Sequence, residues 1–374
     1  MARIIVLGAG MVGSAMARDL SGKHDVTSAD INEHALRKLN EDFSIDIIRL
    51  NISDKEALGS VISDFDLVVC AVPGFMGFST LKTIIGAGKN VADISFFPEN
   101  CLELDALAKE MGVTAIVDIG VAPGMDNLIL GHWNEKMRVD AFECLVGGLP
   151  KKRKWPFAYK APFSPIDVIE EYTRPARYVE NGHEIVREPL TDSELIEFDK
   201  VGTLESFNTD GLRSIIHTMS HIPNMKEKTL RYPGHIDLVK ALKASGFFSE
   251  DRIKVGDHEV VPLDFTSKVL MDEWKLAPED EEFTVMRVTV SGEDDGGNRK
   301  VVYHLYDEYD RETKVSSMAR TTGYTCTAAA NLILDGRFVE KGVFPPELVG
   351  GKDGCFEYFL EYLAARNVHY RVSG

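Results

Sequence analysis

The sequence predicts an α/β protein, in which a second, mostly antiparallel α+β domain is inserted into a Rossmann-type, doubly wound parallel sheet. Short β-branched runs alternate with segments of helical length until about Gly124, hairpin signals then take over, and helical patterns return from about Thr321. The length of 374 residues suits two domains. We expect residues 1–124 with about 321–374 to form one discontinuous Rossmann domain, and residues 125–320 to form the second domain.

The first domain is expected to consist of βαβ units, because strand signals alternate with helical ones along its sequence. The run at 66–72 is the clearest strand, since it is almost wholly apolar and ends at the turn signal Pro73-Gly74. The expected strands are 3–8, 25–30, 45–50, 66–72, 90–94 and 113–118, and the expected helices are 10–20, 79–87 and 102–110.

The second domain is expected to contain hairpins and a few helices. Asn181-Gly182 readily adopts a type I′ turn, so residues 178–186 are predicted to form a hairpin. A second hairpin is predicted from 283–290 and 300–306, around the polar turn 293–297. A further strand is expected at 142–148, and helices are expected at 212–219 and 236–244. The helices expected at 328–334 and 355–366 belong to the C-terminal part of the Rossmann domain.

Composition and charge argue against several function classes. The formal net charge is −17, which repels nucleic-acid phosphates and anionic lipid, so neither nucleic acid nor a membrane is expected as a partner. No stretch approaches the roughly 18 consecutive apolar residues of a membrane span. The cysteines are odd in number and widely spaced, which predicts reduced core thiols in a cytoplasmic protein and no metal site: Cys70, Cys101, Cys144, Cys326 and Cys355.

A Gly-x-Gly-x-x-Gly motif lies between the first predicted strand and the first predicted helix. In that context the first glycine permits a tight turn, the second lets the backbone approach a pyrophosphate, and the third allows close helix packing. Free N–H groups at the start of the helix then meet the anion. The motif residues are Gly8, Ala9, Gly10, Met11, Val12 and Gly13. The alternatives are a Rossmann-like domain that binds no nucleotide, or a glycine-rich turn that is present for packing.

The choice of cofactor depends on the end of the second predicted strand. Asp30 lies about 20 residues after the motif, where a carboxylate can accept hydrogen bonds from the adenosine ribose. Residues 31–34 contain no Arg or Lys for a 2′-phosphate, so NAD is favoured over NADP. Other residues expected beside the cofactor are Ala71, Val72, Pro73, Ser95 and Gly120.

Candidate catalytic groups follow the predicted strands, because ligands of open α/β sheets bind beyond the carboxyl ends of the strands. Asp93 and Asp118 each end such a strand, and Asp118 leads into the constrained loop 120–127. A carboxylate there could accept a substrate proton. Alternatively, Asp93 caps a turn, and the loop is a domain crossover with a helix N-cap at Asp126.

Polar clusters in the second domain are candidates for substrate binding. Arg213 and Arg231 could each hold a carboxylate through two parallel hydrogen bonds. The candidate residues are Tyr159, Lys160, Asn208, Thr209, Asp210, Arg213, Arg231 and His235. The structural alternatives are surface ion pairs for each Arg, an N-cap for Asp210 and a turn position for His235.

These clusters give the chain a resemblance to the saccharopine dehydrogenase family, in the branch with saccharopine reductases and lysine 6-dehydrogenases. The resemblance covers nearly the whole chain, and its most specific segments are Arg-Tyr-Pro-Gly-His at 231–235 and Arg-Thr-Thr-Gly at 320–323. The other segments are 8–13, 120–124, 163–165, 208–211, 228–230 and 342–347. The stretch 169–176 is especially similar to lysine 6-dehydrogenases. The resemblance implies a cytoplasmic homodimer, in which the second domain, residues 125–320, interrupts the Rossmann domain and serves substrate binding and dimerisation.

The chain departs from relatives that form saccharopine at two places. Those relatives typically have Asn-Arg-Asp-Ser where this chain has Asn208-Thr209-Asp210-Gly211, and many have Arg at the position of Ile166. Without these Arg residues, a second substrate carboxylate lacks a partner. The departures therefore favour plain lysine over the larger saccharopine.

The expected function is oxidative deamination of the ε-amine of L-lysine to the 6-semialdehyde, with NAD as the oxidant. Lysine's ammonium has an ordinary pKa near 10.4 and must lose a proton before hydride can leave, so the site needs a base. Asp93 and Asp118 are the candidates for this base or for the partner of the ammonium, because they are nearest the predicted nicotinamide position. Arg231 or Arg213 would hold the α-carboxylate. One alternative is a reductive condensation of an amine with an aldehyde, as in saccharopine reductases or carboxynorspermidine synthases. Another is a non-catalytic NAD-binding sensor.

Overall fold

The computed structural model describes residues 1–162, 165–277 and 280–373. Its first sheet has seven strands in the order β17-β6-β5-β4-β1-β2-β3, and every paired neighbour is parallel. The strand order reverses at β1, between β2 and β4, as in a doubly wound fold. The fold class predicted from the sequence is confirmed.

The elements of this sheet alternate along the chain as the sequence predicted. They are β1 (Arg3–Leu7), α1 (Met11–Ser21), β2 (Asp25–Asp30), α2 (Glu33–Phe43), β3 (Asp46–Arg49), α3 (Lys55–Ile62), β4 (Leu67–Cys70), α4 (Gly74–Gly86), β5 (Asn90–Asp93), η1 (Cys101–Leu104), α5 (Asp105–Glu110), β6 (Thr114–Ile116) and β17 (Gly342–Phe344). The helices α2 and α3 were not predicted. Each begins at a side-chain N-cap, Asn32 and Asp54, which is a local signal of a helix start.

The second sheet is mixed, with β10-β11-β12-β7-β15-β16-β18 as its main path. Its elements, with the helices between them, are α6 (Met125–Asn134), β7 (Arg138–Pro150), α7 (Pro165–Thr173), β8 (Ala176–Glu180), β9 (His183–Arg187), β10 (Glu194–Phe198), β11 (Gly202–Asn208), α8 (Ile215–Thr218), β12 (Asn224–Arg231), α9 (His235–Ala244), β13 (Ile253–Val255), β14 (His258–Val260), α10 (Pro262–Trp274), β15 (Glu282–Asp294) and β16 (Gly297–Glu308). The chain ends with α11 (Ser317–Leu334), α12 (Pro346–Gly350), α13 (Cys355–Ala364) and β18 (Tyr370–Ser373).

Both predicted hairpins form, as β8–β9 and as β15–β16. The helix predicted at 212–219 is reduced to the single turn α8, because Arg213 has a positive φ of 53° that breaks regular helix geometry. The helix predicted at 328–334 is instead the long α11, which begins at Ser317. The last strand, β18, joins the second sheet beside β16.

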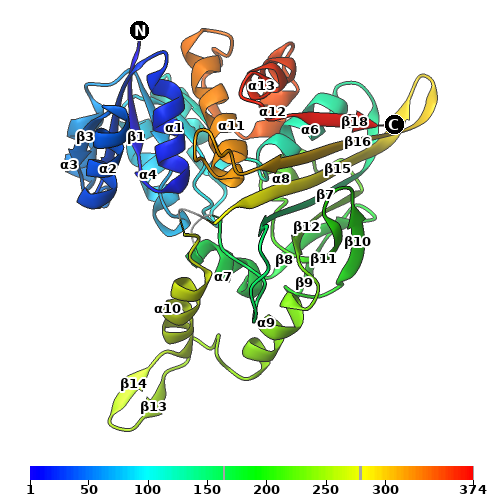
Figure 1. Cartoon of the computed structure of the whole chain (residues 1–374). Coiled ribbons are helices and arrows are strands. Elements are labelled where there is room, and N and C mark those ends of the chain that lie inside the picture. The colour runs from blue at the N-terminus through cyan, green and yellow to red at the C-terminus, as the bar shows by residue number, and fades with distance from the viewer. Residues whose placement is uncertain (163–164, 278–279, 374) are drawn as a thin grey trace.

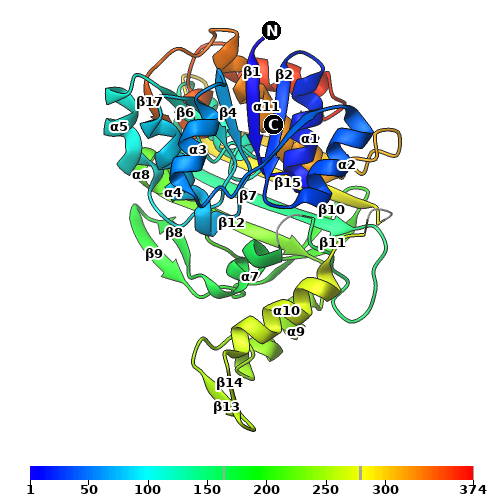
Figure 2. The ribbon, with the colours of Figure 1, turned by 90° about the vertical axis from the view of Figure 1, so that its left-hand side faces the viewer.

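The helix α11 connects the two sheets. It packs against α1 and contacts β4, β5, β15 and β16. Figure 1 shows it between the parallel sheet and the long strands of the second sheet. A projecting arm made of α9, β13, β14 and α10 extends from this body in both Figure 1 and Figure 2. Within the described ranges no helix is long and apolar enough to cross a membrane.

Candidate active site

The glycine motif forms a tight loop between β1 and α1. Gly8 has a φ of +110°, and a Cβ there would lie 2.6 Å from the Ala71 carbonyl oxygen. A Cβ on Gly13 would lie 2.1 Å from the Gly8 carbonyl oxygen, whereas one on Gly10 would meet nothing within 4 Å. Gly8 and Gly13 are therefore required for packing, and Gly10 leaves the open face that a close-lying pyrophosphate needs.

Asp30 lies beside this loop at the end of β2. Its carboxylate accepts hydrogen bonds from the backbone N–H of Ala9 (2.7 Å) and of Asn32 (2.8 Å). These bonds hold the carboxylate beside the glycine loop. Asp30 and this loop line the same cavity, and a ribose bound there would lie next to the carboxylate.

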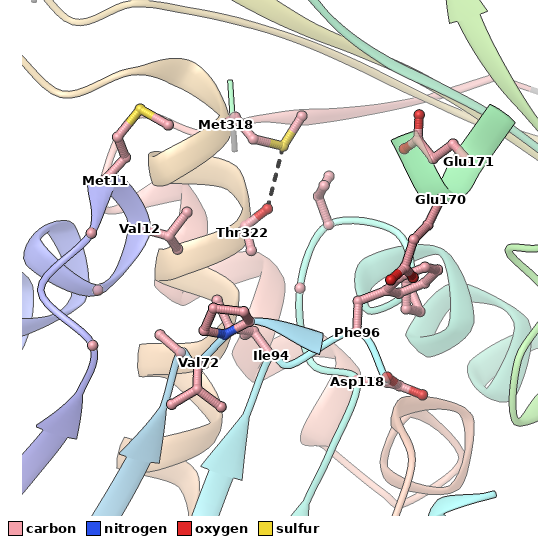
Figure 3. A pocket seen from close by; sticks show the side chains of 18 of the residues that line it. Met11, Val12, Val72, Ile94, Phe96, Asp118, Glu170, Glu171, Met318 and Thr322 are labelled. Atoms are coloured by element: carbon pink, nitrogen blue, oxygen red, sulfur yellow. Dashed lines mark hydrogen bonds between the residues drawn. The ribbon is translucent and has the colours of Figure 1, made fainter. Parts of the chain in front are cut away.

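A cavity of about 680 Å³ extends from the glycine loop to the second sheet. Its lining comes from both sheets and from α11, so it lies at the junction that the fold creates. In Figure 3, Met11 and Val12 lie on one side of it, and Asp118, Glu170 and Glu171 on the other. The lining residues include Gly8, Gly10, Met11, Val12, Gly13, Asp30, Ala71, Val72, Pro73, Ile94, Phe96, Asp118, Gly120, Glu170, Glu171, Arg174, Thr209, Asp210, Gly211, Glu227, Thr229, Arg231, Met318 and Thr322.

Most carboxylates at the second-sheet end of the cavity are paired with a guanidinium. Such pairing compensates the cost of removing both charges from water. The pairs are Asp118–Arg213 (2.9 Å), Asp210–Arg177 (2.9 Å), Glu171–Arg231 (2.6 Å) and Glu170–Arg174. The lining at this end therefore includes both carboxylates and the guanidinium groups of Arg174 and Arg231.

Asp118 and Arg213, predicted as base and as carboxylate ligand, bind each other. Both side chains are buried, and Nη2 and Nε of Arg213 donate to the two Asp118 carboxylate oxygens at 2.9 and 3.4 Å. The Arg213 guanidinium also lies 4.4 Å from the centre of the Phe96 ring and donates to the Phe97 carbonyl. Asp118 lines the cavity, but Arg213 is behind it and is committed to the protein.

Asp93 and Ser95 do not line the cavity, although Ile94 between them does. Asp93 is fully buried, and its Oδ1 accepts the Ser95 N–H at 2.8 Å. Burial raises the pKa of Asp93 from 3.8 to about 7. The structure thus places Asp93 beneath the cavity floor.

Arg231 lines the cavity and is held by a chain of buried polar groups. Its Nε donates to the Tyr172 hydroxyl oxygen at 3.1 Å, and that hydroxyl lies 2.9 Å from Nε2 of His235. His235 Nδ1 lies 3.0 Å from the Phe157 carbonyl oxygen. Because that oxygen can only accept, Nδ1 carries the proton and Nε2 accepts from Tyr172.

His235 and Tyr159 act through Arg231 and do not themselves line the cavity. Burial and then the Arg231 charge lower the pKa of His235 from 6.5 to about 3, which keeps the imidazole neutral. The Arg231 guanidinium lies over the Tyr159 ring, with its Cζ atom 4.3 Å from the centre of the ring. Both residues therefore hold the Arg231 side chain in place.

The remaining substrate candidates are divided between cavity and scaffold. Thr209 lines the cavity and shares a 3.0 Å hydrogen bond with Thr229, and Asp210 lines it while paired with Arg177. Asn208 bonds to Tyr178, Thr191 and Asp192, and Lys160 donates to the Glu273 carbonyl, so both serve the scaffold. Of the segment 163–165, residues 163 and 164 lie outside the described residues.

Sequence reasoning missed four charged lining residues: Glu170, Glu171, Arg174 and Glu227. Glu227 shares a face of β12 with Thr229 and Arg231, since alternate strand residues point the same way. The polar residues at the alternate positions 227, 229 and 231 could have indicated a shared strand face, but the strand β12 itself was not predicted. Nη1 of Arg174 is buried and has no hydrogen-bond partner among the described residues.

Comparisons with known proteins give the same assignment over nearly the whole chain. The model of the saccharopine dehydrogenase NADP binding domain matches residues 4–116, and that of the saccharopine dehydrogenase C-terminal domain matches residues 120–368. The chain is similar to the mitochondrial alpha-aminoadipic semialdehyde synthase of Mus musculus, at 22% identity over 92% of this chain and 45% of that protein. It thus spans about half the length of such relatives.

Two further comparisons concern proteins of similar length. Carboxyaminopropylagmatine dehydrogenase of Synechocystis is 21% identical over 93% of this chain and 92% of its own. The apo saccharopine dehydrogenase (L-Glu forming) of Saccharomyces cerevisiae has the same fold, with a TM-score of 0.82 at 19% identity over 100% of this chain and 99% of that chain. The chain belongs to the saccharopine dehydrogenase family, whose members are dehydrogenases that act on CH–NH groups.

Proposed function

We propose that the protein is an NAD-dependent dehydrogenase that oxidatively deaminates the ε-amine of L-lysine. The observation that carries this proposal is that one continuous cavity joins the glycine loop to a wall with both carboxylates and guanidinium groups. A substrate with ammonium groups and one carboxylate complements such a wall. Lysine has this combination of charges, and the cavity volume suits an amino acid beside a nicotinamide ring.

The reaction balances as R–CH₂–NH₃⁺ + NAD⁺ + H₂O giving R–CHO + NH₄⁺ + NADH + H⁺. NAD, when bound, accepts the hydride. The residues of this chain have three tasks: to hold the α-carboxylate, to take a proton from the ε-ammonium, and to keep the ε-carbon near the glycine loop. We assign the first task to Arg231 and Arg174, which both line the cavity.

The direct test of this function is the appearance of reduced nicotinamide absorbance when NAD and one amine are supplied at mildly alkaline pH. L-Lysine should give a signal, and cadaverine, which lacks the α-carboxylate, should give a much weaker one. Absence of NADH with every single amine would contradict the proposal.

NAD is proposed over NADP because the Asp30 carboxylate, fixed by two backbone N–H groups, would repel a 2′-phosphate. Replacing Asp30 with Asn removes the charge and keeps the shape. We expect the preference for NAD over NADP, measured as the ratio of their kcat/KM values, to fall about tenfold or more, as expected for a hydrogen bond to a charged group. An unchanged ratio would remove Asp30 from cofactor selection.

A homodimer is also proposed, with the projecting arm as part of the contact. Large apolar side chains are exposed on the arm, among them Phe265 (60%) and Val269 (50%), which share one face of α10 at i and i+4. The core of a homodimer interface is apolar, so a second copy could cover this face. Phe265→Glu should shift the mass measured by light scattering from dimer to monomer, whereas a monomeric wild type would contradict the proposal.

A reductive condensation of an amine with an aldehyde is the second candidate. The name of the Synechocystis relative indicates an agmatine that carries a carboxyaminopropyl group, a longer substrate than lysine. The sensor hypothesis has less support, because a protein that only binds NAD does not require charged groups facing the cofactor loop.

A further inference from the structure

We propose that Glu227 is the catalytic acid–base residue of this cavity, and that Gly211 provides the space its carboxyl group occupies. This inference rests on the proposed amine dehydrogenase function. It gives the proton-accepting role to a residue of β12, whereas the sequence had suggested Asp93 or Asp118.

Glu227 differs from the other carboxylates at the second-sheet end of the cavity. Asp118, Asp210, Glu171 and Glu170 each bind an arginine. Glu227 lines the same cavity and is 4% exposed, yet within the described ranges no Lys or Arg forms an ion pair with it and its Oε2 has no hydrogen-bond partner. A buried carboxyl group without a fixed cation can accept the cation of a ligand.

Gly211, which also lines the cavity, leaves the space that the Glu227 carboxyl group occupies. A Cβ at this position would lie 2.0 Å from Cδ and Oε1 of Glu227, and 2.3 Å from Oε2. Any larger residue would therefore displace the carboxyl group from its present place. The carboxyl group of Glu227 can thus occupy its place only because residue 211 has no side chain.

The surroundings of Glu227 are acidic. A carboxyl oxygen of Asp126 on α6, the sulfur of Cys144 on β7 and a carboxyl oxygen of Glu227 all lie within 4.8 Å of one another. Glu171 and Asp210 also face the group with negative charge, while Arg213 opposes them. Burial and then the Asp126 charge raise the pKa of Glu227 well above its ordinary value, and burial raises the pKa of Asp126 to about 7.

These surroundings suit a group that exchanges protons with an amine. Two buried carboxyl groups so close together resist double ionisation, so the pair retains a proton. An arriving ammonium favours the ionised form of Glu227, because an opposite charge nearby lowers the pKa of a carboxyl group. The carboxylate then takes one N–H proton: Glu227–COO⁻ and R–CH₂–NH₃⁺ become Glu227–COOH and R–CH₂–NH₂. The nitrogen lone pair becomes available to drive hydride departure.

The test compares the wild type with Glu227→Gln, Gly211→Ala and a control, Glu143→Gln. Glu143 lies on β7 next to Cys144 and forms a surface ion pair with Lys226 (2.8 Å), so the control makes the same chemical change outside the cavity. The readouts are kcat and KM for L-lysine against pH, NAD affinity by calorimetry, and the infrared band of protonated carboxyl groups. All variants are also assayed in the reductive direction with an amine, an aldehyde and NADH.

We expect Glu227→Gln to lower kcat at least about 100-fold, to abolish the rise of kcat with pH, and to remove one protonated carboxyl band, with NAD affinity intact. Gly211→Ala should lower kcat about 10- to 100-fold with the carboxyl group retained but displaced. Glu143→Gln should match the wild type.

The outcomes separate the two proposals. If the wild type turns lysine over and Glu227→Gln keeps its rate and its pH profile, the role of Glu227 is overturned and the amine dehydrogenase function stands. If the wild type acts only in the reductive direction, the deaminase function fails, while a loss of rate in Glu227→Gln there still supports the acid–base role. A wild type silent in both directions overturns both proposals.

Discussion

Replacing Asp118 with Asn is expected to lower the free energy of unfolding by about 3–5 kcal/mol, the range for breaking a buried ion pair by removing one partner. Both members of the Asp118–Arg213 pair are buried, so the change leaves the Arg213 guanidinium without its counter-charge. Asn suits the positive φ of 52° at this position, and the variant therefore isolates the charge from backbone strain. Chemical denaturation measures the loss.

Turnover of Asp118→Asn should also fall while NAD binding remains, because Asp118 lines the second-sheet end of the cavity, where we propose that the substrate binds. The double variant Asp118→Asn/Arg213→Met is the control for stability. It removes both charges, and we expect it to recover much of the lost stability, since replacing both partners of a buried pair with uncharged groups is often neutral. Unchanged stability and unchanged turnover in Asp118→Asn would remove the residue from both roles.

Replacing Arg231 with Lys is expected to raise the KM for L-lysine about 100-fold. Lys keeps the positive charge but cannot form the planar two-point contact with a carboxylate, and each charged hydrogen bond contributes about 1.5–3 kcal/mol. The new side chain also cannot reproduce the bonds to Tyr172 and Glu171 that hold the guanidinium in place.

Cadaverine provides the matched control for Arg231→Lys within the same protein. It has the amine but no carboxylate, so its kcat/KM should be nearly the same in the wild type and the variant. An equal loss for lysine and cadaverine would show that the substitution disturbs the site as a whole, and would contradict a specific carboxylate contact.

The parts of the site that were predictable from the sequence depend on neighbours along the chain. The loop at Gly8, Gly10 and Gly13 is determined by strand, turn and helix within one βαβ unit, and the structure forms it as predicted. The hairpin turn at Asn181-Gly182 is similarly local. The chemistry of these residues is set by their own backbone geometry.

The parts that were not predictable depend on partners far apart in the sequence. Asp118 and Arg213 were each recognised as functional candidates, but only the fold reveals that they neutralise each other. Glu227 was overlooked because its significance comes from what surrounds it: the space at Gly211, the nearby carboxyl group of Asp126, and the absence of an ion pair with any Lys or Arg of the described residues. Sequence spacing can place a side chain on a strand face, but it does not give the charge environment.

The central claim is that an amine substrate donates a hydride to NAD without an aldehyde or keto acid as a second substrate. L-Lysine with deuterium at both C6 positions tests this claim most directly. We predict that the purified protein, given this lysine and NAD, transfers one deuterium to the nicotinamide ring, as detected by mass spectrometry, and releases ammonia with the aldehyde. The opposite result would be lysine that retains both deuterium atoms, with cofactor turnover only when NADH, an amine and an aldehyde or keto acid are supplied together. That result would contradict the deaminase and identify a condensing reductase.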